Sequence, residues 1–190
     1  GIGRSYSAQH YDLGGLRDFA GPMLEVGRFC VHPAHPDPEI LRIAWAVLTR
    51  HVDATGAQLL FGCSSFPGTD TEGYANAFAM LRERHLAPKQ WLPRVKAPEV
   101  FRFPPLPRSL DAPRARALMP PLLRTYLMMG GWVSDHAVMD RQLNTMHVFT
   151  GVEVGTIPSA RVRALRQMAG RVGQGDRGFQ TPARASPLPR

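Results

Sequence analysis

The clearest periodic pattern in the chain is an apolar stripe between Pro38 and Gly56. Its members recur at three- and four-residue spacings, which place them on one face of an α-helix. Asp37 suits the N-cap, Pro38 is favoured at the first helical position, and Gly56 is typical of a helix end. The sequence therefore predicts a helix that starts at Pro38 and ends at Gly56, with an apolar face made of Ile40, Leu41, Ala44, Trp45, Leu48 and Val52.

Short apolar segments flank this helix on both sides. Residues 24–31 and 58–64 have the length and composition of buried strands, and Gly21-Pro22 breaks the chain before the first of them. A strand, a helix and a second strand in this order predict a parallel pair of strands joined by a right-handed crossover.

The remaining segments predict shorter elements. Residues 4–19 look irregular, with one short helical turn, and residues 72–85 form an amphipathic helix with Tyr74, Ala77, Phe78 and Leu81 on one face. Residues 88–121 contain nine prolines, which leave room for one strand between Val95 and Phe103.

The C-terminal third predicts one more helix before two late segments. Leu122–Met129 is a short helix that Gly130-Gly131 ends, and residues 133–140 and 146–154 follow as strands or loops. These elements indicate an α/β (α+β) fold with a mixed central sheet flanked by helices.

Charge divides the chain into a domain at 1–160 and a tail at 161–190. The net charge is +8, and seven Arg with one Asp give the tail +6, so the domain is nearly neutral. From Gly170 onward the sequence is rich in Gly, Pro and Arg without an apolar period, which predicts disorder. We expect a solvated tail and no nucleic-acid partner; attraction to anionic lipids or to acidic acyl carrier protein is the alternative.

Several function classes do not fit the composition. No run of eighteen apolar residues occurs, and no N-terminal signal is visible, so we expect a cytoplasmic protein, at most peripheral to the inner membrane face. Cys30 and Cys63 both fall in predicted buried strands, where a small apolar thiol is expected rather than a disulfide or a metal ligand.

Candidate chemistry gathers on the strand at 24–31. Glu25 and Arg28 are three residues apart, so they point to opposite faces of a regular strand, and a bulge near Gly27 would bring them together. A catalytic pair and a structural ion pair both remain open on this pattern.

The same strand resembles the fourth strand of GNAT-fold acyltransferases that use acyl carrier protein. The pattern Glu25-x-x-Arg28-Phe29-x-Val31 fits both ornithine N-acyltransferases, which make lyso-ornithine lipid, and acyl-homoserine-lactone synthases. Further blocks resemble the ornithine enzymes alone: Tyr6-Ser7-Ala8-Gln9-His10-Tyr11-Asp12-Leu13, the segment from Leu60 to Asp70, Pro120-Pro121-Leu122-Leu123 and Asn144-Thr145.

This resemblance implies transfer of a 3-hydroxy fatty acyl group from acyl carrier protein to the α-amine of ornithine. Glu25 would take the proton from the amine, and Arg28 would orient the acyl chain or the substrate carboxylate. Backbone N–H groups splayed by a bulge between Gly27 and Cys30 would stabilise the oxyanion. No covalent enzyme intermediate is needed, so Cys30 is not expected to be a nucleophile, and no tightly bound cofactor is expected.

The loop before the central helix is the expected site of the phosphopantetheine phosphate. In the GNAT fold this loop and the helix N-terminus bind phosphate through free N–H groups. Here it contains His32, His35 and Asp37, with Glu39 following and no glycine, which argues against a dedicated acetyl-coenzyme A site. A Pro-rich connector without a ligand is the alternative.

Two departures from the family stand out. The resemblance implies further helices, three strands and several substrate contacts before Tyr6, so we expect this chain to be the C-terminal part of the domain. His147 also stands where the family pattern predicts an acid. A non-catalytic GNAT-like binding module is therefore the alternative function, and an acyl-homoserine-lactone synthase is the third.

Overall fold

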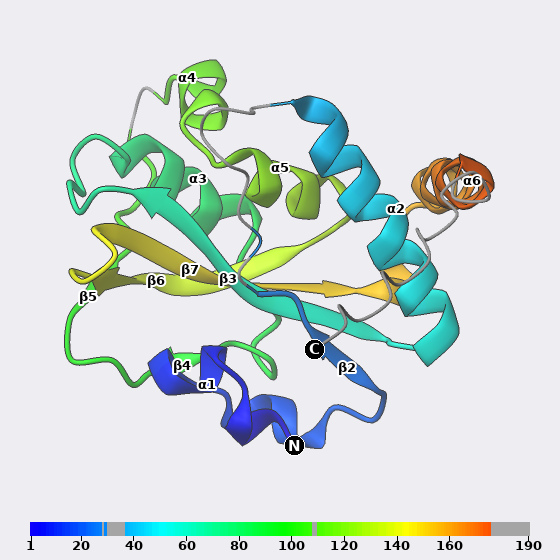
Figure 1. The fold of residues 1–190 in the computed structure, drawn as a ribbon. Helices are drawn as coiled ribbons and strands as arrows, with labels where there is room; N and C mark the ends of the chain where they lie inside the picture. Colours follow the sequence, from blue (N-terminus) through cyan, green and yellow to red (C-terminus); the bar gives the residue numbers. More distant parts are fainter. Residues whose placement is uncertain (28, 30–36, 108–109, 176–190) are drawn as a thin grey trace, which may run out of the picture.

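The computed structural model describes residues 1–27, 29, 37–107 and 110–175. A five-stranded mixed sheet in the order β2-β3-β7-β6-β5 forms its centre (Figure 1). The strands are β2 Met23–Glu25, β3 Leu59–Pro67, β5 Val100–Arg102, β6 Trp132–Asp140 and β7 Thr145–Glu153. β2 and β3 run parallel and the other neighbours antiparallel, so the expected mixed α/β architecture is confirmed.

Helices cover one face of the sheet and an N-terminal layer covers the other (Figure 1). The helices are α2 Pro38–Thr55, α3 Ala75–Arg84, α4 Ala112–Ala117, α5 Pro121–Met128 and α6 Ser159–Gly175, with the short turn η3 Val154–Thr156 before α6. The N-terminal layer holds η1 Ile2–Arg4, α1 Ser7–His10, β1 Tyr11–Asp12 and η2 Gly14–Asp18, and β1 pairs with β4 Arg94–Val95.

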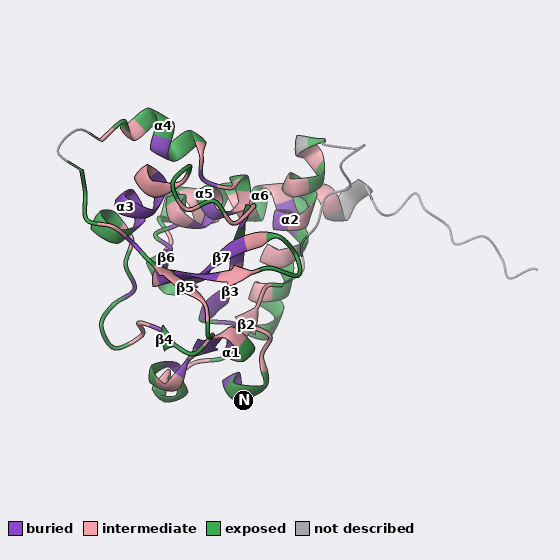
Figure 2. Cartoon of the chain, turned by 90° about the vertical axis from the view of Figure 1, so that its left-hand side faces the viewer, coloured by how far each residue is buried: buried purple, intermediate pink, exposed green. Residues whose placement is uncertain are grey.

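The core follows the alternation of side chains along the long strands. Phe61 on β3 and Phe149 on β7 pack under the N-terminal layer, whereas Phe66 and Val148 pack under α3, α4 and α5. A third cluster joins Trp45 on α2 to Leu60 and Val152. In Figure 2 the buried positions line the central strands and the inward sides of the helices, while the outer surfaces are exposed.

The central helix follows the predicted local signals. The Asp37 carboxylate accepts from the Glu39 backbone N–H at 2.8 Å, Pro38 occupies the first turn, and Gly56 adopts a left-handed φ of 65°. The apolar stripe packs inward except for Ile40, which is 37% exposed. The helix prediction is therefore confirmed, and the two strands that flank α2 are parallel as expected.

Three predictions differ from the structure. β2 ends at Glu25, so Val26 and Gly27 of the predicted strand 24–31 lie outside it. The single strand expected within residues 95–103 is replaced by β4 and β5, which belong to two different sheets. Residues 170–175 continue α6 instead of being disordered, because α6 packs against α2 and Arg166 pairs with Asp53 at 2.8 Å.

The helix predicted at residues 72–85 is α3, which begins three residues later, and the helix predicted at 122–129 is α5. The two late segments are the long strands β6 and β7. Within the described ranges, none of the helices combines the length and apolar character needed to cross a bilayer.

Candidate functional site

The site forms where β2 leaves the sheet. The three residues of β2 pair with the first three of the nine-residue β3, ending at Glu25 opposite Phe61. One further hydrogen bond, from Val26 N–H to the Phe61 carbonyl at 2.7 Å, closes the pairing. Gly62 allows this approach, because a Cβ built on it would lie 2.2 Å from the Val26 carbonyl oxygen.

Glu25 lies at this point and faces the N-terminal layer. Its Oε1 accepts from the Ser7 backbone N–H and the Ser7 hydroxyl, both at 2.7 Å, and its Oε2 accepts from the Tyr6 N–H at 3.0 Å. The carboxylate therefore binds the start of α1. An ionised carboxylate has about four acceptor sites, so these bonds hold it in place and leave Oε2 with room for one more donor.

Cys63 extends this contact along β3. Its Sγ donates to the Ser7 Oγ at 3.5 Å. Burial raises the pKa of the thiol to about 12; the Ser7 hydrogen bond opposes this shift, and the Glu25 charge adds to it. A thiol is a nucleophile only as thiolate, so Cys63 is a poor one.

A polar cavity of about 750 Å³ opens beside Glu25. It passes from the N-terminal side of the sheet toward α2 and α5, and its polar lining comes from four strands and the N-terminal segment: Tyr6, Glu25, Cys63, Ser64, Ser65, Asp140, Thr145 and His147. The two described charged residues of this lining are Glu25 and Asp140, both acidic.

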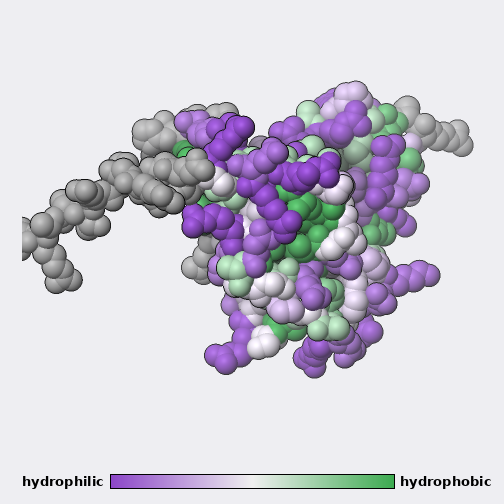
Figure 3. Space-filling view, turned by 90° about the vertical axis from the view of Figure 1, so that its right-hand side faces the viewer, coloured by the Kyte–Doolittle hydropathy of each residue, from purple (hydrophilic) through white to green (hydrophobic). Residues whose placement is uncertain are grey.

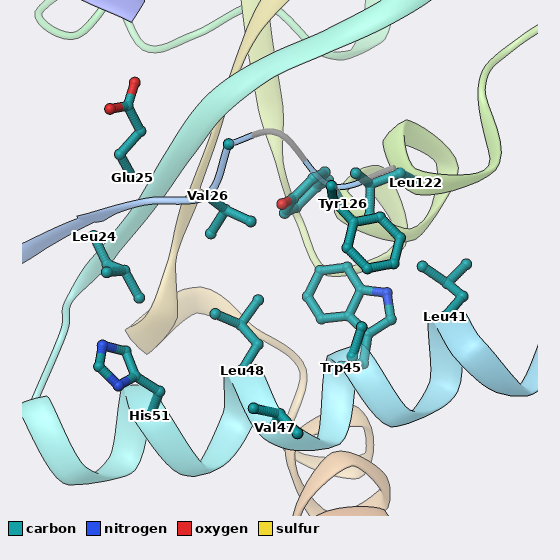
Figure 4. Close-up of a pocket in the computed structure, with 13 residues that line it drawn as sticks. Leu24, Glu25, Val26, Leu41, Trp45, Val47, Leu48, His51, Leu122 and Tyr126 are labelled. Carbon is teal, nitrogen blue, oxygen red and sulfur yellow. The ribbon is translucent and has the colours of Figure 1, made fainter. Parts of the chain in front are cut away.

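An apolar pocket of about 530 Å³ adjoins the polar cavity and shares Glu25, Val26, Gly27, Phe29, Leu41 and Leu122 with it. Figure 4 shows Leu24 and Val26 pointing toward α2 while Glu25 points away, as alternate positions of a strand must. Trp45, Leu48 and Tyr126 complete the apolar walls. Seen from the side that carries α2, hydrophobic side chains gather in the middle of the surface, ringed by hydrophilic ones (Figure 3).

A row of rings continues from the site into the core. The rings of Tyr6 and His10 lie 5.0 Å apart, and those of His10 and His147 lie 4.8 Å apart. Tyr11 contacts His147 from the other side, where the Tyr11 hydroxyl donates a 2.7 Å hydrogen bond to the His147 carbonyl oxygen. Burial and, to a smaller extent, the nearby His10 lower the pKa of His147 to about 4, so this imidazole is neutral at pH 7.

Known proteins share sequence similarity with this chain. The family described as Acetyltransferase (GNAT) domain matches residues 1–46. An L-ornithine N(alpha)-acyltransferase of Rhodobacter capsulatus is 38% identical over 148 residues, which are 77% of this chain and 56% of that protein. A protein of the same name from Rhizobium meliloti is 30% identical over 173 residues, 89% of this chain and 58% of that protein.

The chain is a homologue of L-ornithine N(alpha)-acyltransferases. A third relative of that name, from Agrobacterium fabrum, is 30% identical over 156 residues. The expected GNAT fold is confirmed. No solved structure gives a significant match. The chain spans a little over half the length of these relatives.

The structure describes some of the site residues predicted from the resemblance and not others. Glu25 lies at the junction of the two cavities, whereas Arg28, His32 and His35 lie outside the described residues. Asp37 is described, and its carboxylate caps α2 itself by accepting from the Glu39 N–H. An anion at this helix end would compete with Asp37.

The partners of Glu25 and the buried end of the cavity were not predictable from local sequence patterns. Ser7 is 18 residues from Glu25 in sequence, and Tyr11 is 136 residues from His147, so local patterns do not bring either pair together. The departure at His147 was the one available signal. Across the described residues, no group of three or more His, Cys, Asp or Glu side chains is placed to hold a metal ion.

Proposed function

We propose that the protein containing this chain transfers a fatty acyl group from acyl carrier protein to the α-amine of ornithine, giving lyso-ornithine lipid. The observation that carries the proposal is the junction at Glu25 between an apolar pocket and a polar, acidic cavity. An acyl chain and an amine acceptor need two such compartments with one common point.

The apolar pocket suits the acyl chain. Leu24, Val26 and Trp45 are among its walls, and each buried methylene of a chain contributes about 0.8 kcal/mol. The neighbouring cavity suits the acceptor, because its described charged residues are carboxylates that attract amines. The names of the relatives support ornithine as the acceptor.

Glu25 acts as the general base in this proposal. The ornithine α-ammonium gives a proton to Oε2, and the free amine then attacks the thioester carbonyl. The C–N bond forms and the C–S bond breaks. The thiolate of the donor takes up the second proton, which the nitrogen loses as the amide forms, while the proton on Glu25 passes to solvent. The Ser7 and Tyr6 bonds hold the carboxylate in position through the reaction.

The thioester would enter where β2 parts from β3. Backbone N–H groups after Val26 are proposed to stabilise the oxyanion that forms on the carbonyl, and Arg28 is proposed to orient the acyl chain or the substrate carboxylate. The loop before α2 suits a carrier-bound donor better than acetyl-coenzyme A. The Asp37 carboxylate already occupies the N-terminus of α2, and the loop sequence has no glycine.

The test supplies the full-length protein with L-ornithine and either 3-hydroxyacyl carrier protein or acetyl-coenzyme A. Mass spectrometry should detect N-acyl-ornithine with the carrier protein at a much higher rate than N-acetyl-ornithine with acetyl-coenzyme A. Lack of acyl transfer from both donors would overturn the proposed function. Equal rates would retain the N-acyltransferase and remove the carrier-protein preference.

A further inference from the structure

Tyr126 brings a hydroxyl into the apolar pocket. It lies on α5, is 6% exposed, and its ring packs edge-on against that of Trp45, with the centroids 5.2 Å apart. Two described residues of this lining are ionisable besides Tyr126, but Glu25 points away from the pocket and His51 is exposed at the surface. Tyr126 therefore supplies a hydroxyl to a lining that is otherwise almost wholly apolar.

This hydroxyl is unpaired and open to the pocket. No hydrogen bond joins it to any of the described residues. In the same part of the chain, every side-chain N or O atom that is both unpaired and fully buried is a nitrogen, such as Nε1 of Trp45. The Tyr126 oxygen is not one of these atoms, so a ligand in the pocket can reach it. Burial raises the pKa of Tyr126, so the hydroxyl stays protonated and can both donate and accept.

The hydroxyl lies near the junction with the polar cavity. Leu122 lines both cavities, and Tyr126 follows it by one turn of α5, about 6 Å along the helix axis. From there the Tyr126 oxygen points toward Val26, which also lines both cavities (Figure 4). The far end of the pocket is at His51, about 15 Å along α2 from Leu41 at the junction. A chain that enters at the junction therefore meets the Tyr126 hydroxyl within its first few carbons.

An acyl chain in the pocket changes the surroundings of this hydroxyl. Before the chain enters, water in the open pocket can bond to it. A plain hydrocarbon chain excludes that water and leaves the hydroxyl unpaired, which is unfavourable. A chain that carries a hydroxyl of its own at this point replaces the water with a direct hydrogen bond.

We propose that the Tyr126 hydroxyl binds a hydroxyl group on the acyl chain, close to the thioester, and so selects hydroxylated donors over plain ones. The proposal rests on the proposed function, because it takes the apolar pocket as the place of the acyl chain. The 3-position suits this contact, since it is close to the carbonyl carbon, which is proposed to lie where β2 parts from β3. The ring contact with Trp45 holds the Tyr126 side chain in this direction.

Equilibrium binding to the full-length protein tests this without turnover. The probes are dodecanoyl thioesters of N-acetylcysteamine, which stand in for the carrier-bound donor and are offered without ornithine. We expect the 3-hydroxydodecanoyl thioester to bind about tenfold more tightly than the plain one. The sign is diagnostic, because a pocket without a polar group would bind the more hydrophobic plain chain better. The isomer with its hydroxyl at the far end of the chain should gain nothing.

Tyr126→Phe keeps the ring and removes the oxygen. It should abolish the preference by weakening the binding of the 3-hydroxy thioester and not that of the plain one. Tyr74→Phe is the matched control, because the Tyr74 hydroxyl donates to the Pro67 carbonyl at 3.1 Å and Tyr74 does not line the pocket. The subsite would be wrong if the parent protein bound the plain thioester as tightly, if the far-end isomer matched the 3-hydroxy thioester, or if Tyr126→Phe kept the preference.

Acyl-transfer assays on the same proteins separate this subsite from the proposed function. Discrimination in binding that depends on Tyr126, without any acyl-ornithine product, would retain the subsite and reject the proposed function. Acyl transfer at equal rates from 3-hydroxyacyl and plain acyl carrier protein would do the opposite. If Tyr126→Phe slowed transfer from both donors equally, the hydroxyl would act on the reacting thioester instead of the chain, which would also overturn the subsite.

Discussion

The Ser7 hydroxyl donates a 2.7 Å hydrogen bond to Glu25 Oε1, which also accepts from the Ser7 backbone N–H. Two distant blocks of sequence, one at the start of α1 and one in β2, meet in this contact. Glu25 thus has two roles, since the same carboxylate fixes the N-terminal layer and faces the cavity. Tests of its chemistry must separate activity from stability.

Glu25→Gln should lower kcat by about 10²–10⁴-fold, because an amide is not a general base. It should also lower the free energy of unfolding by about 1–3 kcal/mol, because the new NH₂ group faces an N–H donor. Steady-state rates at saturating substrate and urea unfolding measure the two effects.

Ser7→Ala is the companion variant to Glu25→Gln. It removes the hydroxyl that donates to Glu25 and accepts from Cys63, two hydrogen bonds that contribute about 1 kcal/mol each. It leaves the carboxylate and the backbone contacts, so most of kcat should remain. If Glu25→Gln retained most of its turnover per folded molecule, the assignment of Glu25 as base would be wrong.

Gly62→Ala should disturb the point where β2 leaves β3. The added Cβ would lie 2.2 Å from the Val26 carbonyl oxygen, so the backbone next to Glu25 must move. We expect a loss of about 1–3 kcal/mol in unfolding free energy and a lower kcat. Gly155→Ala is the control, because nothing lies within 4 Å of its Cβ. Equal melting temperatures and rates for both variants would contradict the geometry.

Local signals made some elements predictable from sequence. α2 follows from Asp37, Pro38 and Gly56, each of which acts within one helical turn. α6 was missed because Gly170, Gly173 and Gly175 lower the helix propensity of its second half. Its packing against α2 is tertiary: Leu165 joins the cluster around Trp45, and Arg166 pairs with Asp53, 113 residues away. The pairing of β2 with β3 is likewise a tertiary effect, because it depends on the close approach of Val26 to Gly62.

The site also combines a residue that a local pattern marks with residues that only the tertiary structure brings together. Glu25 was found because a family pattern marks it, and pattern recognition needs no coordinates. The cavity that joins Glu25 to Asp140 and His147 depends on the order of β2, β3, β7 and β6 in the sheet. Strand order is a property of the whole fold, which explains why these residues were not grouped from sequence.

Cys63 should be unreactive in the folded protein. With the pKa of its thiol at about 12, the thiolate fraction at pH 8 is about three orders of magnitude below that of an unfolded cysteine. Iodoacetamide labelling followed by peptide mass spectrometry should find Cys63 unmodified until urea is added. Cys63→Ser should keep acyl transfer, since a hydroxyl can also donate to Ser7. Loss of activity in this variant would point to a covalent role.

His147 should make stability depend on pH below neutrality. Its pKa is about 4 in the folded protein and 6.5 ordinarily, so between these values the unfolded chain binds the proton more readily. The contribution of neutral His147 to the free energy of unfolding is fully present above pH 6.5. It is lost as pH falls toward 4, by about 3 kcal/mol in total.

His147→Gln is the test of this dependence, measured as urea midpoints from pH 7.5 down to pH 4.5. The pKa values of His136 and His85 are also lowered by burial, and both residues remain in the variant, so the difference between the two slopes isolates His147. His10, His136 and Asp140 act electrostatically on His147, and Tyr11 bonds to it; all four are unchanged in the variant.

We expect the variant to lose less stability than the parent protein on acidification, even if it is less stable at pH 7.5. Parallel curves would show that His147 already binds its proton in the folded state, which would contradict a buried neutral imidazole.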